Sequence, residues 1–322
     1  MTFETVVFRY AAITCVTLCT PLNLFTMYVI IAKSPKNLKL YKYVLLNISF
    51  WVFVYDVTVG VMLLPMTTPT KPIALYFTGI ASFFGPVGGA LCAALAVLCI
   101  SECLAAVLLG FCYRYLALND DFRIRGWKPE PRHYHYGAAM MIVVPPGAMF
   151  AVAVYACSPR ETFTKLILNA SAEGTNILDS SLLIGPEKEG FVPGSVVLSM
   201  YIALWAICLA VCIIGIIGQL RIHRVSMSNF TYGLHIQLIK SLAVQTAAPL
   251  ILFASPVCVV LVGTVFNLKF LNYAVLMMQF SMSAHSMINS FAVILFIAPY
   301  RNAARKMFQL KYAATISVSS YI

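Results

Sequence analysis

Residues 10–32 read YAAITCVTLCTPLNLFTMYVIIA, a run of 23 positions without a charged side chain, and Lys33 and Lys36 follow it. A helix needs about 20 apolar residues to cross ~30 Å of hydrocarbon, so this run predicts a transmembrane helix. The run is longer than the ~7–15-residue core of a signal peptide, and its basic residues follow rather than precede it. We therefore expect the mature protein to retain this helix.

Six more apolar runs follow the first, and short polar segments between them carry most of the charge. The chain is 61% hydrophobic and 10% charged, which leaves too little polar surface for a soluble fold. Backbone amides inside a bilayer must bond internally, and runs of this length do so as helices. The sequence predicts an all-α, polytopic, seven-transmembrane-helix bundle over residues 1–300, with spans near 10–32, 44–66, 78–112, 137–157, 193–218, 240–263 and 272–298.

The third run is longer than one span, and its start contains Gly85, Pro86, Gly88 and Gly89. We expect the ordered helix to begin near this point and residues 67–85 to be mostly loop. After the last span, residues 301–322 are predicted to form a short amphipathic helix on the inner leaflet and then a cytoplasmic tail.

Basic residues indicate the orientation of the bundle. With the N-terminus outside and the C-terminus inside, sixteen of the 22 Lys and Arg residues fall in inner segments, as the positive-inside rule requires. The long segment between the fourth and fifth spans is then outside, and its Asn169 begins the sequon Asn-Ala-Ser, a predicted glycosylation site. The basic residues are spread over four segments beside the membrane, which favours contact with membrane lipids and argues against nucleic-acid binding.

Ionisable residues inside a membrane are costly and mark functional sites. Asp56, Glu102 and His285 are the three that lie near the middle of predicted spans, and Asn289 lies one helical turn from His285 on the same face. We expect these four residues to form a buried polar cluster near mid-membrane. Three roles remain open for it: a two-state conformational switch, a polar contact that only fixes helix packing, or part of an ion or substrate path.

Prolines interrupt the sixth predicted span at Pro249 and Pro256. Proline removes a backbone hydrogen bond and bends a helix, so these positions predict either a hinge or a static kink. Gln245, one turn before Pro249, is placed to bond the carbonyl groups that proline leaves free.

A series of short motifs gives the chain a family resemblance over nearly its whole length. In chain order they are Thr20-Pro21, Lys33-Ser34-Pro35-Lys36, Leu45-Leu46-Asn47, Trp51, Asp56, Arg114-Tyr115, Gln245 with Pro249 and Pro256, and Pro299-Tyr300-Arg301. In this order and spacing they resemble the nematode serpentine chemoreceptors of the Srh and Sri classes. The resemblance implies a G-protein-coupled receptor for environmental chemicals, with a heterotrimeric G protein as partner. Its expected location is the plasma membrane, with the ciliary membrane of sensory neurons as one candidate site.

The resemblance also implies roles for individual residues. Arg114, followed by Tyr115, matches the arginine that ends the third helix and faces the G protein. Cys112 and Tyr113 precede it where related receptors often carry an acid, so an ionic lock through that neighbour is not expected. Aromatic residues with few polar neighbours suit a small apolar ligand. Residues of this kind at helical spacing more often belong to the core of a bundle. The candidates, in the outer halves of the last three helices, are Tyr201, Trp205, Phe253, Tyr273, Gln279 and Phe280.

Three other functions fit the sequence less well than a chemoreceptor does. An opsin needs a lysine within the last span, and residues 272–298 contain none. A secondary transporter or channel is the main alternative. Many transporters are built from internal repeats, and no repeat is visible in this sequence. Asp56, Glu102 and His285 are residue types used in hydrolysis, yet no HExxH or GxSxG motif accompanies them. The sequence predicts no enzyme activity, no cofactor and no metal site.

Overall fold

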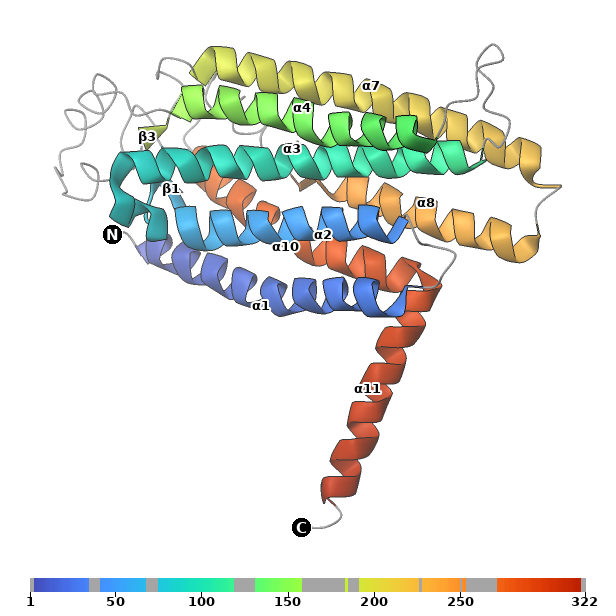
Figure 1. The fold of residues 1–322 in the computed structure, drawn as a ribbon. Coiled ribbons are helices and arrows are strands. Elements are labelled where there is room, and N and C mark those ends of the chain that lie inside the picture. Colours follow the sequence, from blue (N-terminus) through green and yellow to red (C-terminus); the bar gives the residue numbers. More distant parts are fainter. Residues whose placement is uncertain are drawn as a thin grey trace.

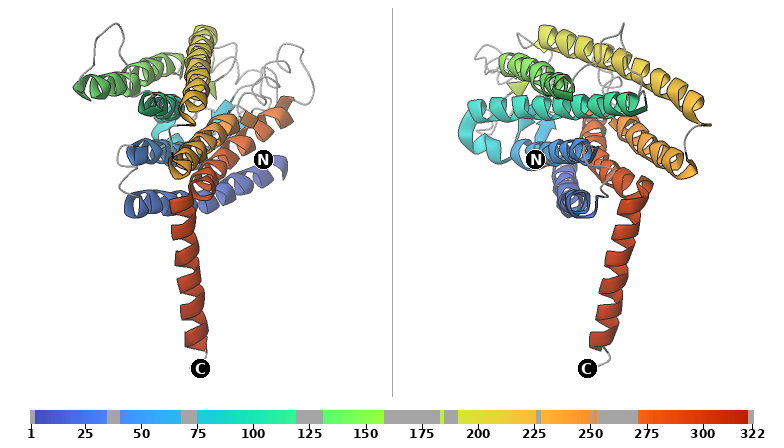
Figure 2. Two further views of the ribbon diagram at one scale, coloured as in Figure 1. Left: turned by 90° about the vertical axis from the view of Figure 1, so that its right-hand side faces the viewer. Right: turned by 45° about the vertical axis from the view of Figure 1, so that its right-hand side comes forward.

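The computed structural model describes residues 3–34, 41–67, 75–118, 131–157, 183–184, 191–225, 228–249, 251–252 and 271–319 of the chain. Its α-helices are α1 (Phe3–Lys33), α2 (Tyr41–Val57), α3 (Gly85–Leu118), α4 (Pro131–Cys157), α7 (Phe191–His223), α8 (Asn229–Pro249), α10 (Leu271–Phe296) and α11 (Ala298–Ser319). All of these except α11 lie along one another and form a single bundle (Figures 1 and 2).

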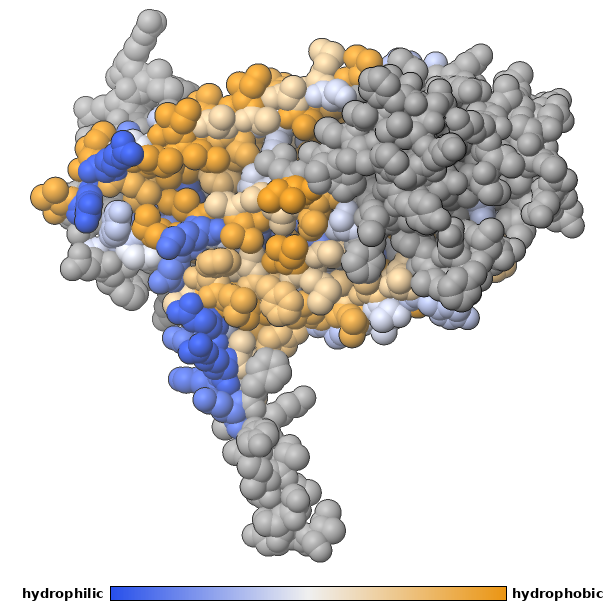
Figure 3. All heavy atoms as spheres, turned by 180° about the vertical axis from the view of Figure 1, so that it is seen from behind, coloured by the Kyte–Doolittle hydropathy of each residue, from blue (hydrophilic) through white to orange (hydrophobic). Residues whose placement is uncertain are grey.

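The outer surface of the bundle is apolar. Within the described residues, five helical segments are long and apolar enough to cross a membrane, and Ala284–Phe296 in α10 is a shorter apolar stretch. Large side chains such as Val143, Met200 and Ile214 are exposed on the outside. Figure 3 shows apolar residues over one face of the bundle and hydrophilic residues gathered where α11 leaves it. A lipid solvent accounts for this surface, because it does not penalise exposed hydrocarbon side chains.

Successive bundle helices run in alternating directions (Figure 1). As a result, α1 begins at one end of the bundle and α11 leaves from the other. Figure 1 also shows α11 projecting sideways, across the direction of the bundle helices, as expected of a helix that lies on a membrane surface. This helix extends from Ala298 to Ser319, well beyond the short helix that the sequence predicts.

The C-terminal end of α2 is irregular. From here on, the end of the bundle from which α11 leaves is called inner and the opposite end outer, as names for the two ends only. The helix continues as a π-helix, η2 (Thr58–Leu63), and ends at Leu64, which has a φ of 43°. Pro65 follows, and proline disfavours a helical conformation in the residue before it. The chain then enters an antiparallel sheet of three strands, β1 (Pro65–Thr67), β2 (Leu75–Phe77) and β3 (Leu183–Ile184), with β2 in the middle. Pro65 pairs with Phe77, and Leu75 pairs with Ile184.

This sheet corrects the expectation of a mostly loop segment at residues 67–85. The segment contains β2 and a 3₁₀ helix, η3 (Ile80–Phe84). Part of the pairing comes from β3, more than a hundred residues later, and local sequence patterns do not reveal such a partner. The predicted start of the third helix is correct, because α3 begins at Gly85, whose φ of 67° is a conformation that glycine adopts without steric cost.

Two apolar clusters fill the bundle. The inner cluster includes Val52, Phe111 and Tyr300, and lies toward the end from which α11 leaves. The outer cluster includes Tyr55, Phe77 and the small residues of α3 from Ala90 to Cys99, and lies against the sheet. On α2 and α3 the clusters meet within about one helical turn, and several buried polar side chains lie near that level of the bundle.

Candidate functional site

A polar layer separates the two apolar clusters. We give this name to Asn23 of α1, Asp56 of α2, Ser101 and Glu102 of α3, and His285, Ser286, Asn289 and Ser290 of α10, all of which are buried. These residues come from four helices, so the layer connects elements that are far apart in the sequence. Burying polar groups in an apolar bundle is costly unless they bond to one another, so their partners decide what the layer can do.

Asn23 is the centre of the hydrogen-bond network. Its Nδ2 donates to Asp56 Oδ2 at 3.0 Å and to Ser286 Oγ at 2.6 Å. Its Oδ1 accepts from Ser290 Oγ at 2.7 Å. One fully buried amide therefore ties α1 to both α2 and α10. Asn23 is absent from the predicted cluster because it is not ionisable, and the cluster was predicted from ionisable residues in apolar spans. An amide near the middle of an otherwise apolar span was the available signal, since such side chains join transmembrane helices.

The four residues that the sequence proposes as a cluster are all buried in this layer, at 1–7% exposure. They are not joined by one network: no hydrogen bond between described residues links Glu102 to Asp56. Glu102 Oε2 and both amide atoms of Asn289 are buried without a hydrogen-bond partner in the described part of the chain. Unsatisfied buried groups favour alternative arrangements or bound water.

Arg114 lies near the inner end of α3 and is only 4% exposed. Its guanidinium carbon is 3.9 Å from the centre of the Tyr41 ring and 5.7 Å from that of Tyr113. The two tyrosine rings are themselves stacked, with centroids 6.3 Å apart. Arg114 Nε and Nη2 have no hydrogen-bond partner among the described residues. The arginine is thus held by aromatic rings, through a cation–π contact, rather than by an acid.

His235 of α8 lies close to Arg114. Burial, and next the positive charge of Arg114, lower the pKa of His235 below its usual value. Its Nδ1 is buried without a partner in the described residues. Tyr115, the neighbour of Arg114, packs against α7, where a Cβ added to Gly215 would come within 2.6 Å of the Tyr115 ring. The inner end of α3 therefore fits closely against α2 and α7 and lies near α8.

Side-chain hydrogen bonds also secure the inner ends of α8 and α1. Gln237 Oε1 accepts from the Ala298 backbone N–H at 3.2 Å, and Ser241 Oγ donates to the Ala292 carbonyl at 3.3 Å. The first contact joins α8 to the start of α11, and the second joins α8 to α10. Ser34 Oγ and Tyr300 Oη are 2.7 Å apart and link the end of α1 to α11.

The predicted hinge is only partly described. Gln245 is buried in α8, and neither its Nε2 nor its Oε1 has a partner among the described residues, so no bond to the carbonyls near Pro249 is seen. Pro249 is the last residue of α8. Pro256 lies outside the described residues, as does Asn169.

Two of the candidate ligand contacts are described, and both make bonds to α3. Tyr201 Oη donates to the Ser101 carbonyl at 3.2 Å, and Trp205 Nε1 donates to the Leu104 carbonyl at 2.7 Å. Trp205 is 3% exposed and belongs to the inner cluster, which favours the packing role. Phe253 lies outside the described residues, and the side chains of Tyr273, Gln279 and Phe280 are not described although α10 contains them.

No group of three or more His, Cys, Asp or Glu side chains that could hold a metal ion occurs among the described residues. The arrangement instead offers an internal polar layer, and an arginine with free donors at one end of the bundle. Neither feature by itself identifies a reaction.

Comparison with known proteins assigns the fold to a family. A family model described as "Serpentine type 7TM GPCR chemoreceptor Srh" matches residues 4–310, which is nearly the whole chain. A search of the curated proteins gave no match. The match covers all seven bundle helices and most of the described part of α11. The chain is a multi-pass membrane protein and belongs to the Srh family of serpentine seven-transmembrane G-protein-coupled chemoreceptors.

Proposed function

We propose that the protein binds a small environmental chemical in the outer half of the bundle and activates a heterotrimeric G protein through its inner face. The family is one of chemoreceptors, which supports a sensory role. The observation that carries the coupling step is the environment of Arg114, a buried cation close to α8 whose Nε and Nη2 have no hydrogen-bond partner among the described residues.

The proposed orientation places the N-terminus outside and α11 in the cytosol. It is supported by the excess of Lys and Arg in the segments assigned to the inside. The first part of α11 adds Arg301, Arg305 and Lys306, beside the membrane surface, where anionic inner-leaflet lipids attract basic residues. In this orientation the seven spans keep the boundaries given above and Asn169 is accessible to glycosylation. We place the receptor in the plasma membrane, with the ciliary membrane of sensory neurons as one location to examine.

Activation requires a pocket for the G protein between the inner ends of the helices. In the structure, Gln237 and Ser241 hold α8 against α10 and the start of α11. Outward movement of α8 about the region of Gln245, Pro249 and Pro256 would break these two bonds. It would also expose Arg114, because α8 carries His235 close to it. Freed guanidinium donors can then bond carbonyl or carboxylate groups of the G protein.

The polar layer supplies the switch in this proposal. Asn289 and Glu102 have unused hydrogen-bonding atoms, whereas Asp56 is bonded to Asn23. Rotation or sliding of α10 would exchange hydrogen-bond partners within the layer, including those of His285. The net cost in free energy would be small, because groups without partners would gain hydrogen bonds. Ligand contacts from Tyr201, Trp205, Phe253, Tyr273, Gln279 and Phe280 would bias this exchange from the outer side.

The test is agonist-dependent nucleotide exchange on a co-expressed heterotrimeric G protein, screened with volatile and water-soluble chemicals. The receptor should show exchange with at least one compound, and Arg114→Ala should abolish it at equal surface expression. Arg221→Ala is the matched control, because Arg221 is exposed on α7 and should leave exchange unchanged. Full exchange in Arg114→Ala, or uptake or ion current without any G protein, would contradict the proposal.

A further inference from the structure

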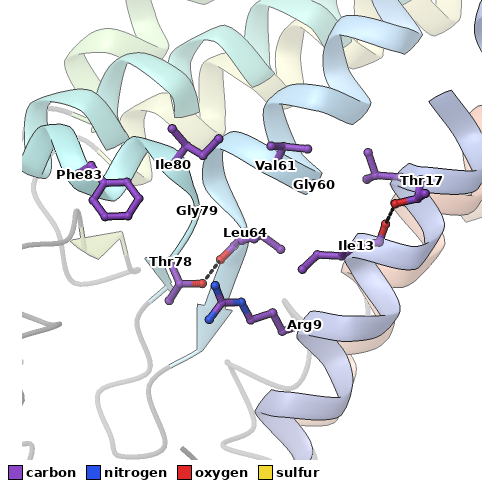
Figure 4. Close-up of a pocket in the computed structure, with 11 residues that line it drawn as sticks. Arg9, Ile13, Thr17, Gly60, Val61, Leu64, Thr78, Gly79, Ile80 and Phe83 are labelled. Carbon is purple, nitrogen blue, oxygen red and sulfur yellow. Dashed lines mark hydrogen bonds between the residues drawn. The ribbon is translucent and has the colours of Figure 1, made fainter.

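A cavity of about 300 Å³ lies between α1 and the irregular end of α2. It is lined by α1 residues between Arg9 and Thr17, by η2 with Leu64, and by the segment from Thr78 to Phe83. Figure 4 shows the Ile13, Thr17 and Leu64 side chains around one gap between these elements. Tyr201 and Trp205, the candidate ligand contacts whose side chains the structure describes, do not line it.

Irregular backbone forms one wall of the cavity. The π-helix η2 and the left-handed residue Leu64 both lie on it. Gly60 faces α1 so closely that an added Cβ would come within 2.0 Å of Val16 Cγ2, and a Cβ on Gly79 would come within 2.2 Å of the Met62 carbonyl oxygen. π-helical turns and strained residues concentrate at functional sites, so this wall marks a candidate binding site.

Arg9 is the charged residue of this cavity, and the other lining residues are apolar, glycine or threonine. In Figure 4 its guanidinium group points toward Leu64 and Thr78. The Thr78 hydroxyl and backbone N–H both donate to the Leu64 carbonyl, so these groups are already bonded. No ion pair to Arg9 occurs among the described residues. A guanidinium group in this position selects an anionic group, and carboxylate or phosphate oxygens match its paired donors.

The rim of the cavity is apolar and exposed. Phe83 is 86% exposed, and Ile80 and Ile13 are 43% and 42% exposed. Ile80 begins the apolar stretch Ile80–Leu116 and Arg9 begins Arg9–Lys33, so the rim lies where two membrane spans meet the interface. A ligand that enters there comes from the membrane and needs a hydrocarbon part. A volume at the low end of the ~300–1,000 Å³ typical of ligand pockets admits one small molecule.

We propose that this cavity binds a single-chain anionic amphiphile of the fatty-acid type. Its carboxylate pairs with Arg9, and its hydrocarbon chain lies between α1 and η2, against Ile13, Val61 and Leu64. The ligand would bridge α1 and the outer end of α2 and thereby stabilise their packing. The site is separate from the chemosensory pocket, and its occupancy requires no G protein.

The first experiment measures binding of radiolabelled dodecanoic acid to the full-length receptor in phosphatidylcholine nanodiscs. Saturable binding with one site per receptor is expected. Arg9→Gln should weaken it about tenfold or more, since a hydrogen bond to a charged group contributes ~1.5–3 kcal/mol, and Arg9→Lys should retain part of the affinity. Dodecanol, which lacks the charge, should bind wild type and Arg9→Gln equally. Absence of saturable binding, or equal dodecanoate affinity in Arg9→Gln, would overturn the proposal.

A second pair of variants tests where the hydrocarbon chain of the ligand lies. Ile13→Trp fills the cavity and should abolish dodecanoate binding, whereas Leu18→Trp, at an exposed position on the same helix outside the lining, should not. Equal binding in the two variants would place the ligand elsewhere. Nanodiscs with added phosphatidylglycerol separate the two possible sources: unchanged binding supports a single-chain ligand, and strong competition would assign the cavity to a bilayer phospholipid instead. Because no G protein is present, failure here is distinguishable from failure of the proposed signalling function.

Discussion

Asn23 shows how one uncharged residue can organise a membrane bundle. Its amide bonds to Asp56, Ser286 and Ser290 at once. Asp56 itself is predictable from the sequence, because an acid in an apolar span is conspicuous and expensive. Its partner Asn23 is not predictable from the sequence, because which polar residue of another helix meets Asp56 depends on how the helices rotate and pack. The buried set could therefore be predicted, but its hydrogen-bond network could not.

We predict that Asn23→Ala destabilises the folded receptor. Three buried groups lose a partner, and each unsatisfied buried group costs ~1–3 kcal/mol. A lower unfolding temperature of the purified receptor and reduced surface expression are expected. Thr14→Ala is the control, because the hydrogen bond of Thr14 seen among the described residues runs to the Tyr10 carbonyl on the same exposed helix turn. An unchanged unfolding temperature in Asn23→Ala would show that the network contributes little.

Tyr41 supports a second prediction at this scale. Its ring contacts the Arg114 guanidinium, while its hydroxyl is buried without a partner in the described residues. Tyr41→Phe keeps the ring and should leave basal nucleotide exchange unchanged. Tyr41→Leu removes a cation–π contact worth roughly 0.5–2 kcal/mol and should raise basal exchange by severalfold. The measurement is exchange on a co-expressed G protein at matched surface expression. If the phenylalanine and leucine variants behave alike, the ring does not restrain Arg114.

At the scale of secondary structure, the long helices follow from the sequence and their ends do not. In the hydrocarbon of a bilayer, backbone groups must bond within the span, so long apolar runs form helices almost regardless of which apolar residues they contain. Ends depend on single residues and distant partners. The start of α3 at Gly85 could be predicted from the glycines and proline there. The pairing of β2 with β3 could not, because it brings together segments on either side of α3 and α4. The extension of α11 to Ser319 could not be predicted either, because no apolar run marks this segment as a helix.

The contact between α8 and the start of α11 gives a prediction at this scale. Gln237→Ala removes the hydrogen bond to Ala298 N–H, and the double variant with Ser241→Ala removes both described side-chain ties to α10 and α11. Basal nucleotide exchange should rise modestly in the single variant and further in the double one, because α8 is then freer to move outward. Lys240→Ala, at an exposed position of α8, is the control. Basal exchange that stays at the wild-type level in the double variant would show that these bonds do not restrain α8.

For the molecule as a whole, composition and hydropathy were sufficient to predict a seven-helix membrane bundle. The family match and the five long apolar helical segments among the described residues agree with that prediction. Function at this scale rests on which end of the bundle faces the cytosol. Arg114, His235 and the contacts of α8 all lie toward the end from which α11 leaves, so they can meet a G protein only if that end is inside.

The most direct test uses short epitope tags, one fused at the N-terminus and one after Ile322, and antibody labelling of intact and then permeabilised cells. We predict that antibody reaches the N-terminal tag in intact cells and the C-terminal tag only after permeabilisation. Both tags accessible from the same side, or the C-terminal tag accessible in intact cells, would contradict the proposed arrangement and the coupling mechanism built on it.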